Sequence, residues 1–224
     1  MSTVQADFDR LALLDDEGWT ANNHYHTSLL THLPSRVENA LEIGCGTGAF
    51  ARQLALRCER VTALDLSPEM IRVAQSHSRK FTNLEYVLAD ATSWDFPQSH
   101  FDFVCSIATL HHLEQRELLL KIRDSIKPGG VFVILDLVES NSMFERMNDL
   151  VSLGLSGTLR LLNNGRLKPP VEVRKAWEQH GKHDSYLTLK DVRKLSGEVL
   201  PHSIVKRLWM WRYMLVYRKQ LSSP

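Results

Sequence analysis

The chain has 224 residues, of which 43% are hydrophobic and 24% charged, and its formal net charge is +1. This length suits one domain with a sizeable core. The near-neutral charge argues against nucleic acid as a partner, because nucleic-acid-binding domains usually carry a strong basic excess.

The three cysteines, Cys45, Cys58 and Cys105, have no metal-ligand spacing, which indicates reduced thiols in a cytoplasmic protein. The segment from Met1 to Glu17 carries acidic groups and no long apolar run. No other stretch reaches the roughly 20 apolar residues that a spanning helix needs. We therefore expect neither a secretory signal nor a membrane span.

A helix is expected before the first strand, because Tyr25, Leu29 and Leu33 recur at helical spacing and Pro34 ends the pattern. Helices placed before a nucleotide-binding core often fold over the ligand. An ordinary packing helix is an equal alternative. The candidates for closing the site are Trp19, His24, Tyr25 and His26.

The central motif follows a predicted strand at Asn39–Ile43 and consists of Gly44, Gly46 and Gly48, after which a helix runs to about Arg57. A strand, a tight glycine turn and a helix opening hold a nucleotide-like ligand over the helix N-terminus. The segment Gly44-x-Gly46-x-x-Ala49 also satisfies the relaxed dinucleotide fingerprint. The motif alone therefore leaves a methyl donor and a nicotinamide cofactor open.

Two further predicted strands carry an acid at or near their ends. The strand Arg60–Asp65 places Asp65 about 20 residues after the glycine turn, the usual offset for a carboxylate that accepts ribose hydroxyls. Ser67 and Pro68 then predict a helix start, and that helix runs to about Arg79. The third strand, 84–91, contains Asp90.

A fourth strand, Phe101–Ile107, is nearly continuously apolar, as expected for a strand covered on both faces. It runs into the segment Leu110–Leu113, which contains His111 and His112. A helix over 114–126, a turn at 127–130 and a fifth strand over 131–137 follow.

The rest of the chain is predicted to form helices, followed by a terminal hairpin. The residues 139–181 show apolar helical spacing, which predicts either ordinary core or a wall of an acceptor pocket. The apolar residues are Met143, Met147, Leu150, Val151, Leu155, Leu159 and Leu162. His180, His183 and Tyr186 either line that pocket or lie on the surface. A helix should begin after Thr188 and end near Val199, and two strands at 203–209 and 211–219 should form the hairpin.

This order of motifs resembles the class I S-adenosylmethionine-dependent methyltransferases of the small-molecule type. The resemblance rests on Glu42 with the three glycines, Asp65, Asp90, the Leu-His-His-Leu segment and the turn Lys127-Pro128-Gly129-Gly130, and it covers roughly residues 40–137. It implies an α/β fold with a Rossmann-like, doubly wound, mostly parallel seven-stranded sheet and a C-terminal antiparallel hairpin. Helices would lie on both faces, and the N-terminal helix and the helices after strand five would form a cap.

We expect one domain over residues 1–224, with a helical cap at 8–33, a donor-binding core at 34–138, acceptor-pocket helices at 139–187, and the last helix and hairpin at 188–224. The resemblance implies S-adenosyl-L-methionine as methyl donor and S-adenosyl-L-homocysteine as product. Glu42 would lie near the donor's ammonium group, Asp65 at the ribose and Asp90 at the adenine. The implied donor contacts are Glu42, Gly44, Cys45, Gly46, Gly48, Asp65, Leu66, Met70, Asp90, Ala91, Ile107 and Tyr25.

The donor's methyl group is already electrophilic, so the protein mainly has to align an acceptor lone pair with it. A hydroxyl or protonated amine acceptor would also need a general base, for which His111 and His112 are the candidates. These histidines can equally shape the pocket, and His26 and His183 are weaker candidates. The histidines show no metal-binding pair with a third ligand, so no metal site is expected.

The leading hypothesis is methyl transfer to an oxygen or nitrogen of a small-molecule acceptor, as in secondary metabolism. A nicotinamide-dependent oxidoreductase and a non-catalytic methyltransferase-like partner protein are the alternatives. The oligomeric state is left open.

Overall fold

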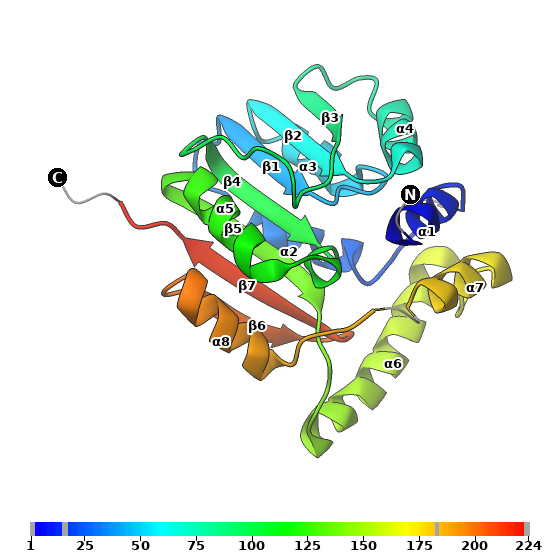
Figure 1. Cartoon of the computed structure of the whole chain (residues 1–224). Helices are drawn as coiled ribbons and strands as arrows, with labels where there is room; N and C mark the ends of the chain where they lie inside the picture. Colours follow the sequence, from blue (N-terminus) through cyan, green and yellow to red (C-terminus); the bar gives the residue numbers. More distant parts are fainter. Residues whose placement is uncertain (1–2, 15–17, 182–183, 222–224) are drawn as a thin grey trace.

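The computed structural model describes residues 3–14, 18–181 and 184–221 (Figure 1). His183 falls outside these ranges, so its predicted role lies outside the described residues. The strands form one seven-stranded sheet in the order β3-β2-β1-β4-β5-β7-β6. They are β1 (Asn39–Ile43), β2 (Arg60–Asp65), β3 (Leu84–Leu88), β4 (Phe101–Ile107), β5 (Ile126–Leu137), β6 (Ile204–Leu208) and β7 (Arg212–Arg218).

Strands β1 to β5 run parallel, and β7 pairs antiparallel with both β5 and β6. The chain order reverses between β1 and β4, which is the position where open α/β sheets bind ligands at the carboxyl ends of their strands. The predicted sheet with its antiparallel terminal hairpin is confirmed.

Helices cover both faces of the sheet (Figure 1). They are α1 (Thr3–Ala12), α2 (His26–Leu30), α3 (Ala49–Ala55), α4 (Pro68–His77), α5 (Gln115–Ser125), α6 (Met143–Asn164), α7 (Val171–His180) and α8 (Leu189–Val199), with short 3₁₀ turns η1 (Asn23–Tyr25) and η2 (Leu110–His112). The expected helix starts are confirmed at α4, where the Ser67 hydroxyl accepts from the Met70 N–H, and at α8, where Thr188 and Asp191 form a capping box.

The core lies in two clusters on opposite faces of the sheet. Ile122 of α5 and Val192 of α8 belong to one cluster, and Leu29 of α2 and Phe50 of α3 belong to the other. All five residues of β1 are buried because the strand is covered from both sides. This packing fixes the carboxyl ends of the central strands in place.

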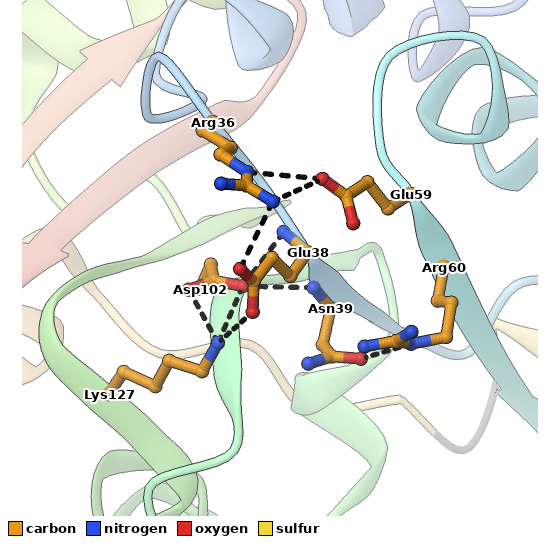
Figure 2. Close-up of polar contacts among 7 residues, drawn as sticks. All are labelled: Arg36, Glu38, Asn39, Glu59, Arg60, Asp102 and Lys127. Carbon is orange, nitrogen blue, oxygen red and sulfur yellow. Dashed lines mark hydrogen bonds and ion pairs between the residues drawn. The ribbon is translucent and has the colours of Figure 1, made fainter.

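Polar side chains tie the strands together at the opposite, amino-terminal edge (Figure 2). Asp102 Oδ2 accepts from the N–H groups of Glu38 and Asn39, each at 2.9 Å. Lys127 Nζ lies 2.9 Å from Asp102 Oδ1, and Arg60 Nε donates to Asn39 Oδ1 at 2.9 Å. These contacts join the beginnings of β1, β2, β4 and β5, so this edge is occupied by structural interactions.

Two expectations about element boundaries need correction. The segment Lys127–Gly130, predicted as a turn before the fifth strand, lies inside β5, whose pairing with β4 shifts register between Phe101 and Phe103. Gly129 adopts a φ of +81° there, which glycine alone takes without strain. Helix α1 was not predicted from the sequence, although it packs against α4 and α7.

Helix α6 turns its polar side toward the rest of the protein. Its Asp149 binds Arg207 at 3.1 Å, and its Ser152 hydroxyl accepts from the Met210 N–H at 3.0 Å. The apolar residues Met143, Met147, Leu150, Val151 and Leu162 are exposed. These five residues are not part of the core, whereas Leu159 of the same helix packs against it. The acceptor-wall role of this segment stays a prediction.

Candidate active site

The glycine turn after β1 combines unusual backbone angles with close neighbours. Gly44, Gly46 and Gly48 have φ values of +74°, +52° and +78°. A Cβ atom would fall 2.0 Å from Thr109 Oγ1 at Gly44 and 2.2 Å from Tyr86 Oη at Gly48. At Gly46 a Cβ atom would meet Met70 Sδ at 4.0 Å and no other atom that near in the described part of the chain, so a ligand can approach the main chain there.

Asp65, at the end of β2, connects the glycine turn to the start of α4. Its Oδ2 accepts from Gly46 N at 2.8 Å, and its Oδ1 accepts from Ser67 N at 2.9 Å. Burial raises the pKa of this carboxyl group. Each carboxylate oxygen retains acceptor capacity beyond its main-chain bond, so Asp65 can still receive ligand hydroxyls.

Glu42, on β1, is buried with an unsatisfied oxygen. The residue is only 2% exposed, and its Oε2 atom has no hydrogen-bond partner among the described residues. Burial, reinforced by the charge of Asp65, raises its pKa well above the ordinary value. Because an unpaired buried oxygen is costly, a cationic ligand group next to Glu42 would supply the missing partner.

Helix α1 borders the same region. Asp9 Oδ1 accepts from Ser67 Oγ at 2.5 Å and from Glu69 N at 3.4 Å, at the N-terminus of α4. Leu11 and Met70 pack in one apolar cluster. The sequence analysis did not identify Asp9, since its position depends on contacts between residues 58 or more positions apart.

The other predicted donor contacts occupy different environments. Asp90 is exposed, and its Oδ1 accepts from the main-chain N–H and hydroxyl of Thr92 at 2.8 and 2.7 Å, closing a turn. Ala91 and Cys45 are buried, and Leu66 and Ile107 are half-buried. Burial also raises the pKa of the Cys45 thiol, which makes it a packing group rather than a nucleophile.

The polar side-chain atoms of Tyr25 and His26 contact residues outside the glycine turn. The Tyr25 hydroxyl donates to the Trp209 carbonyl at 3.0 Å. His26 Nδ1 lies 3.0 Å from Gln53 Nε2, and its ring packs on Phe50. Burial lowers the pKa of His26 to about 4. This environment is that of a neutral packing histidine.

His111 forms a closely spaced pair with Asp136, which ends β5. The Nδ1 atom lies 2.6 Å from Asp136 Oδ1, and the His111 N–H donates to Asp136 Oδ2 at 3.1 Å. Both side chains are buried. A carboxylate in this position holds the Nδ1–H tautomer and leaves the Nε2 lone pair available.

His112 belongs to a second polar group that includes residues from the segment after α7. Its Nδ1 lies 3.3 Å from Asp184 Oδ1, and Tyr186 donates its hydroxyl to Asp184 Oδ2 at 2.9 Å. His180 Nδ1 lies 3.4 Å from Asp7 Oδ2 of α1. Burial, reinforced by His111, lowers the pKa of His112 to about 4, so its imidazole is neutral at pH 7.

These side chains surround a cavity of about 180 Å³. Its lining residues are Val4, Asp7, His111, His112, His180, Asp184 and Ser185. Asp136 and Asp184 were missed by the sequence analysis. Asp136 could have been found as a third acid near the carboxyl end of a predicted parallel strand, whereas no local pattern marks Asp184.

Comparison with known proteins shows what the chain is similar to. Residues 41–134 match the methyltransferase domain family model. The chain is 28% identical to an uncharacterized methyltransferase of Mycobacterium bovis over 91% of this chain and 98% of that one. The N-methyltransferase NodS from Bradyrhizobium japonicum WM9, solved with S-adenosyl-L-homocysteine, superposes with a TM-score of 0.66 at 20% identity, covering 97% of this chain and 99% of that one. Residues 41–134 therefore match a methyltransferase domain, and the fold is that of S-adenosylmethionine-dependent methyltransferases.

The chain is also similar to the O-methyltransferase cnsE of Penicillium expansum, with 34% identity over 48% of this chain and 41% of that one. The family's methyl donor fits the carboxyl edge of the sheet. The open approach at Gly46 admits the ligand, and the unpaired Glu42 oxygen matches the donor's ammonium group. Within the described ranges, none of the helices of the methyltransferase combines the length and apolar character needed to cross a bilayer.

Proposed function

We propose that this methyltransferase transfers the methyl group of S-adenosylmethionine to an oxygen or nitrogen of a small-molecule acceptor bound beside His111. The observation that carries this proposal is the His111–Asp136 pair, which borders a cavity at the carboxyl ends of β4 and β5. The similarity to an N-methyltransferase and an O-methyltransferase supports both acceptor atoms equally. The acceptor could be a secondary metabolite.

The donor would lie along the glycine turn. Glu42 would pair with its ammonium group, Asp65 would accept from the ribose hydroxyls, and Asp90 would mark the adenine edge. Tyr25 would take part through its ring only, because its hydroxyl is bonded to Trp209. The remaining proposed contacts are Gly44, Cys45, Gly46, Gly48, Leu66, Met70, Ala91 and Ile107.

The proposed chemistry divides between donor and protein. S-adenosylmethionine supplies an electrophilic methyl group when bound. The acceptor lone pair forms the new bond to that carbon as the carbon–sulfur bond breaks, which leaves S-adenosylhomocysteine. His111 Nε2 takes the acceptor's proton, while Asp136 holds Nδ1 and stabilises the resulting imidazolium. His112, which is neutral, lies beside His111 with ring centroids 3.8 Å apart and would shape the site there.

Two measurements test this function. Calorimetric titration should show S-adenosylhomocysteine binding more tightly than NAD⁺ or NADP⁺, and the reverse order would support the oxidoreductase alternative. Incubation with S-adenosylmethionine and a library of phenols, alcohols and amines should give a methylated product by mass spectrometry. Donor binding without transfer to any acceptor would support a non-catalytic partner role.

The buried free thiols of Cys45, Cys58 and Cys105 support a cytoplasmic location.

A further inference from the structure

Three side chains near the cavity offer ligand atoms that face one another. His111, His112 and Asp184 each contribute one such atom, and all three atoms lie within 4.8 Å of one another. Each of these side chains is only 6% exposed. We propose that His111, His112 and Asp184 form a binding site for a divalent transition-metal ion such as Zn²⁺, Co²⁺, Fe²⁺ or Mn²⁺.

The ligand types suit such an ion. Two imidazoles and one carboxylate are a common donor set for zinc and other first-row metals, and three protein ligands leave a position open. Ligands about 2.1 Å from a tetrahedral ion lie roughly 3.4 Å from each other. His112 Nδ1 and Asp184 Oδ1 are 3.3 Å apart, so this pair already has coordination spacing.

The surrounding groups leave the required atoms available. Asp136 engages Nδ1 of His111, so the ligand atom of His111 is Nε2, the arrangement that usually orients a metal-binding histidine. Tyr186 donates to Oδ2 of Asp184 and leaves Oδ1 for the ion. A carboxylate and a phenol would thus hold two of the three ligands in orientation.

The local charge also favours a cation. Asp7, Asp136 and Asp184 lie around this cluster and have histidines as their ionic partners. Among the described residues, none of these three carboxylates forms an ion pair with a lysine or arginine. The buried Arg212 guanidinium interacts electrostatically with Asp136 and offsets part of this charge. A divalent ion would balance the remainder, which is costly when left uncompensated.

The ion's effect on the reaction rests on the proposed function, whereas its binding does not. An acceptor hydroxyl in the open coordination position would have a lowered pKa and lose its proton to solvent. The lone pair of His111 would then bind the ion and would no longer accept that proton. The ligands come from positions 111, 112 and 184, so the spacing along the chain gave no indication of this site.

The direct test uses the full chain after treatment with a chelator. Titration with Co²⁺ alone should give one equivalent of bound ion with the visible absorption of a nitrogen- and oxygen-ligated site, and Zn²⁺ should displace it. His112→Gln and Asp184→Asn should each weaken binding at least about tenfold. His100→Gln, at an exposed histidine, should leave binding unchanged. S-adenosylhomocysteine titration of each variant shows whether it is folded.

Asp136→Asn tests whether His111 is a metal ligand or has a purely structural role. It keeps all three ligands, yet it should weaken Co²⁺ binding by about 10–100-fold, as expected for the partner of a ligating histidine. The site is overturned if the wild-type chain binds no stoichiometric ion, or if His112→Gln and Asp184→Asn retain wild-type affinity. A chain that binds one ion but methylates no acceptor upholds the site and contradicts the proposed function.

Discussion

Nδ1 of His111 and Oδ1 of Asp136 lie 2.6 Å apart, and the same carboxylate also accepts from the His111 main-chain N–H. Asp136 therefore fixes both the backbone and the ring of His111. It connects the segment after β4 to the end of β5, where the proposed acceptor binds. The orientation of Nε2 depends on this pair.

In chelator-treated protein, where the Nε2 lone pair of His111 is free to accept a proton, Asp136→Asn should lower kcat by about 100-fold, the order of a general-base contribution, because the amide cannot hold the same tautomer or stabilise an imidazolium. The affinity for S-adenosylhomocysteine should stay within about twofold. Steady-state kinetics with an acceptor found in the library, together with calorimetry, checks both expectations. Asp95→Asn, at an exposed carboxylate, is the matched control, and an unchanged kcat in Asp136→Asn would remove His111 from the proton transfer.

Donor binding should release a proton from Glu42. Burial and the charge of Asp65 raise its pKa well above the ordinary value in the free protein, whereas a neighbouring ammonium group favours the ionised form. Calorimetry of S-adenosylhomocysteine binding in buffers of different ionisation enthalpy measures this proton. Glu42→Gln should abolish the release and weaken binding by about 10–100-fold, the usual contribution of a charged hydrogen bond.

The folding stability of Glu42→Gln should not fall, because the substitution removes a poorly satisfied buried acid. Thermal unfolding of the ligand-free variant serves as the control. If the wild-type protein and Glu42→Gln released equal numbers of protons on binding S-adenosylhomocysteine, the ammonium group of the ligand would not lie beside Glu42.

Gly46→Ala and Gly48→Ala should differ in their effects. Both positions have positive φ, so alanine costs roughly 1–2 kcal/mol of backbone strain at each. At Gly48 the new Cβ also meets Tyr86 Oη at 2.2 Å, whereas at Gly46 it enters open space. Gly48→Ala should therefore lose more folding stability, while Gly46→Ala should lose donor affinity at modest cost in stability. Denaturant unfolding and calorimetry measure the two quantities, and equal behaviour of the two variants would contradict the placement of the donor.

Acid should destabilise the protein partly through His26. Its pKa is lowered from 6.5 to about 4 in the folded state, so the unfolded chain binds more protons between these values. Stability is then fully present above about pH 6.5 and falls as the pH decreases toward 4, by up to about 3 kcal/mol. His26→Gln should reduce the slope of unfolding free energy against pH in this window. His100→Gln should keep the wild-type slope, and an unchanged slope in His26→Gln would mean that the buried imidazole does not titrate there.

Much of the fold could be predicted because its signals are local. The apolar strands, the Ser67 and Thr188 caps and the acids Asp65 and Asp90 follow from short patterns. Parallel strands bring their carboxyl ends to one edge, so His111 was correctly expected after β4. Its role as a base, and those of the donor contacts, stay predictions.

The remaining features depend on distant contacts. Helix α1 has the apolar spacing of a helix at Val4, Phe8 and Leu11, which the sequence analysis overlooked. Its position depends on distant contacts, namely Asp9 with Ser67 and packing on α7. Asp184 meets His112 across 72 positions of chain. The exposed apolar side of α6 has the spacing of a buried face, so periodicity alone assigned it to the interior.

The position of β7 between β5 and β6 has a consequence for folding. Arg212–Arg218 is the last strand along the chain, yet it supplies hydrogen bonds to both neighbours. During synthesis β5 therefore has an unpaired edge, and β6 has no partner, until residues Arg212–Arg218 have left the ribosome. A chain that stops before Arg212 would keep the glycine turn but expose an apolar strand edge, so it should aggregate rather than fold into a smaller active enzyme.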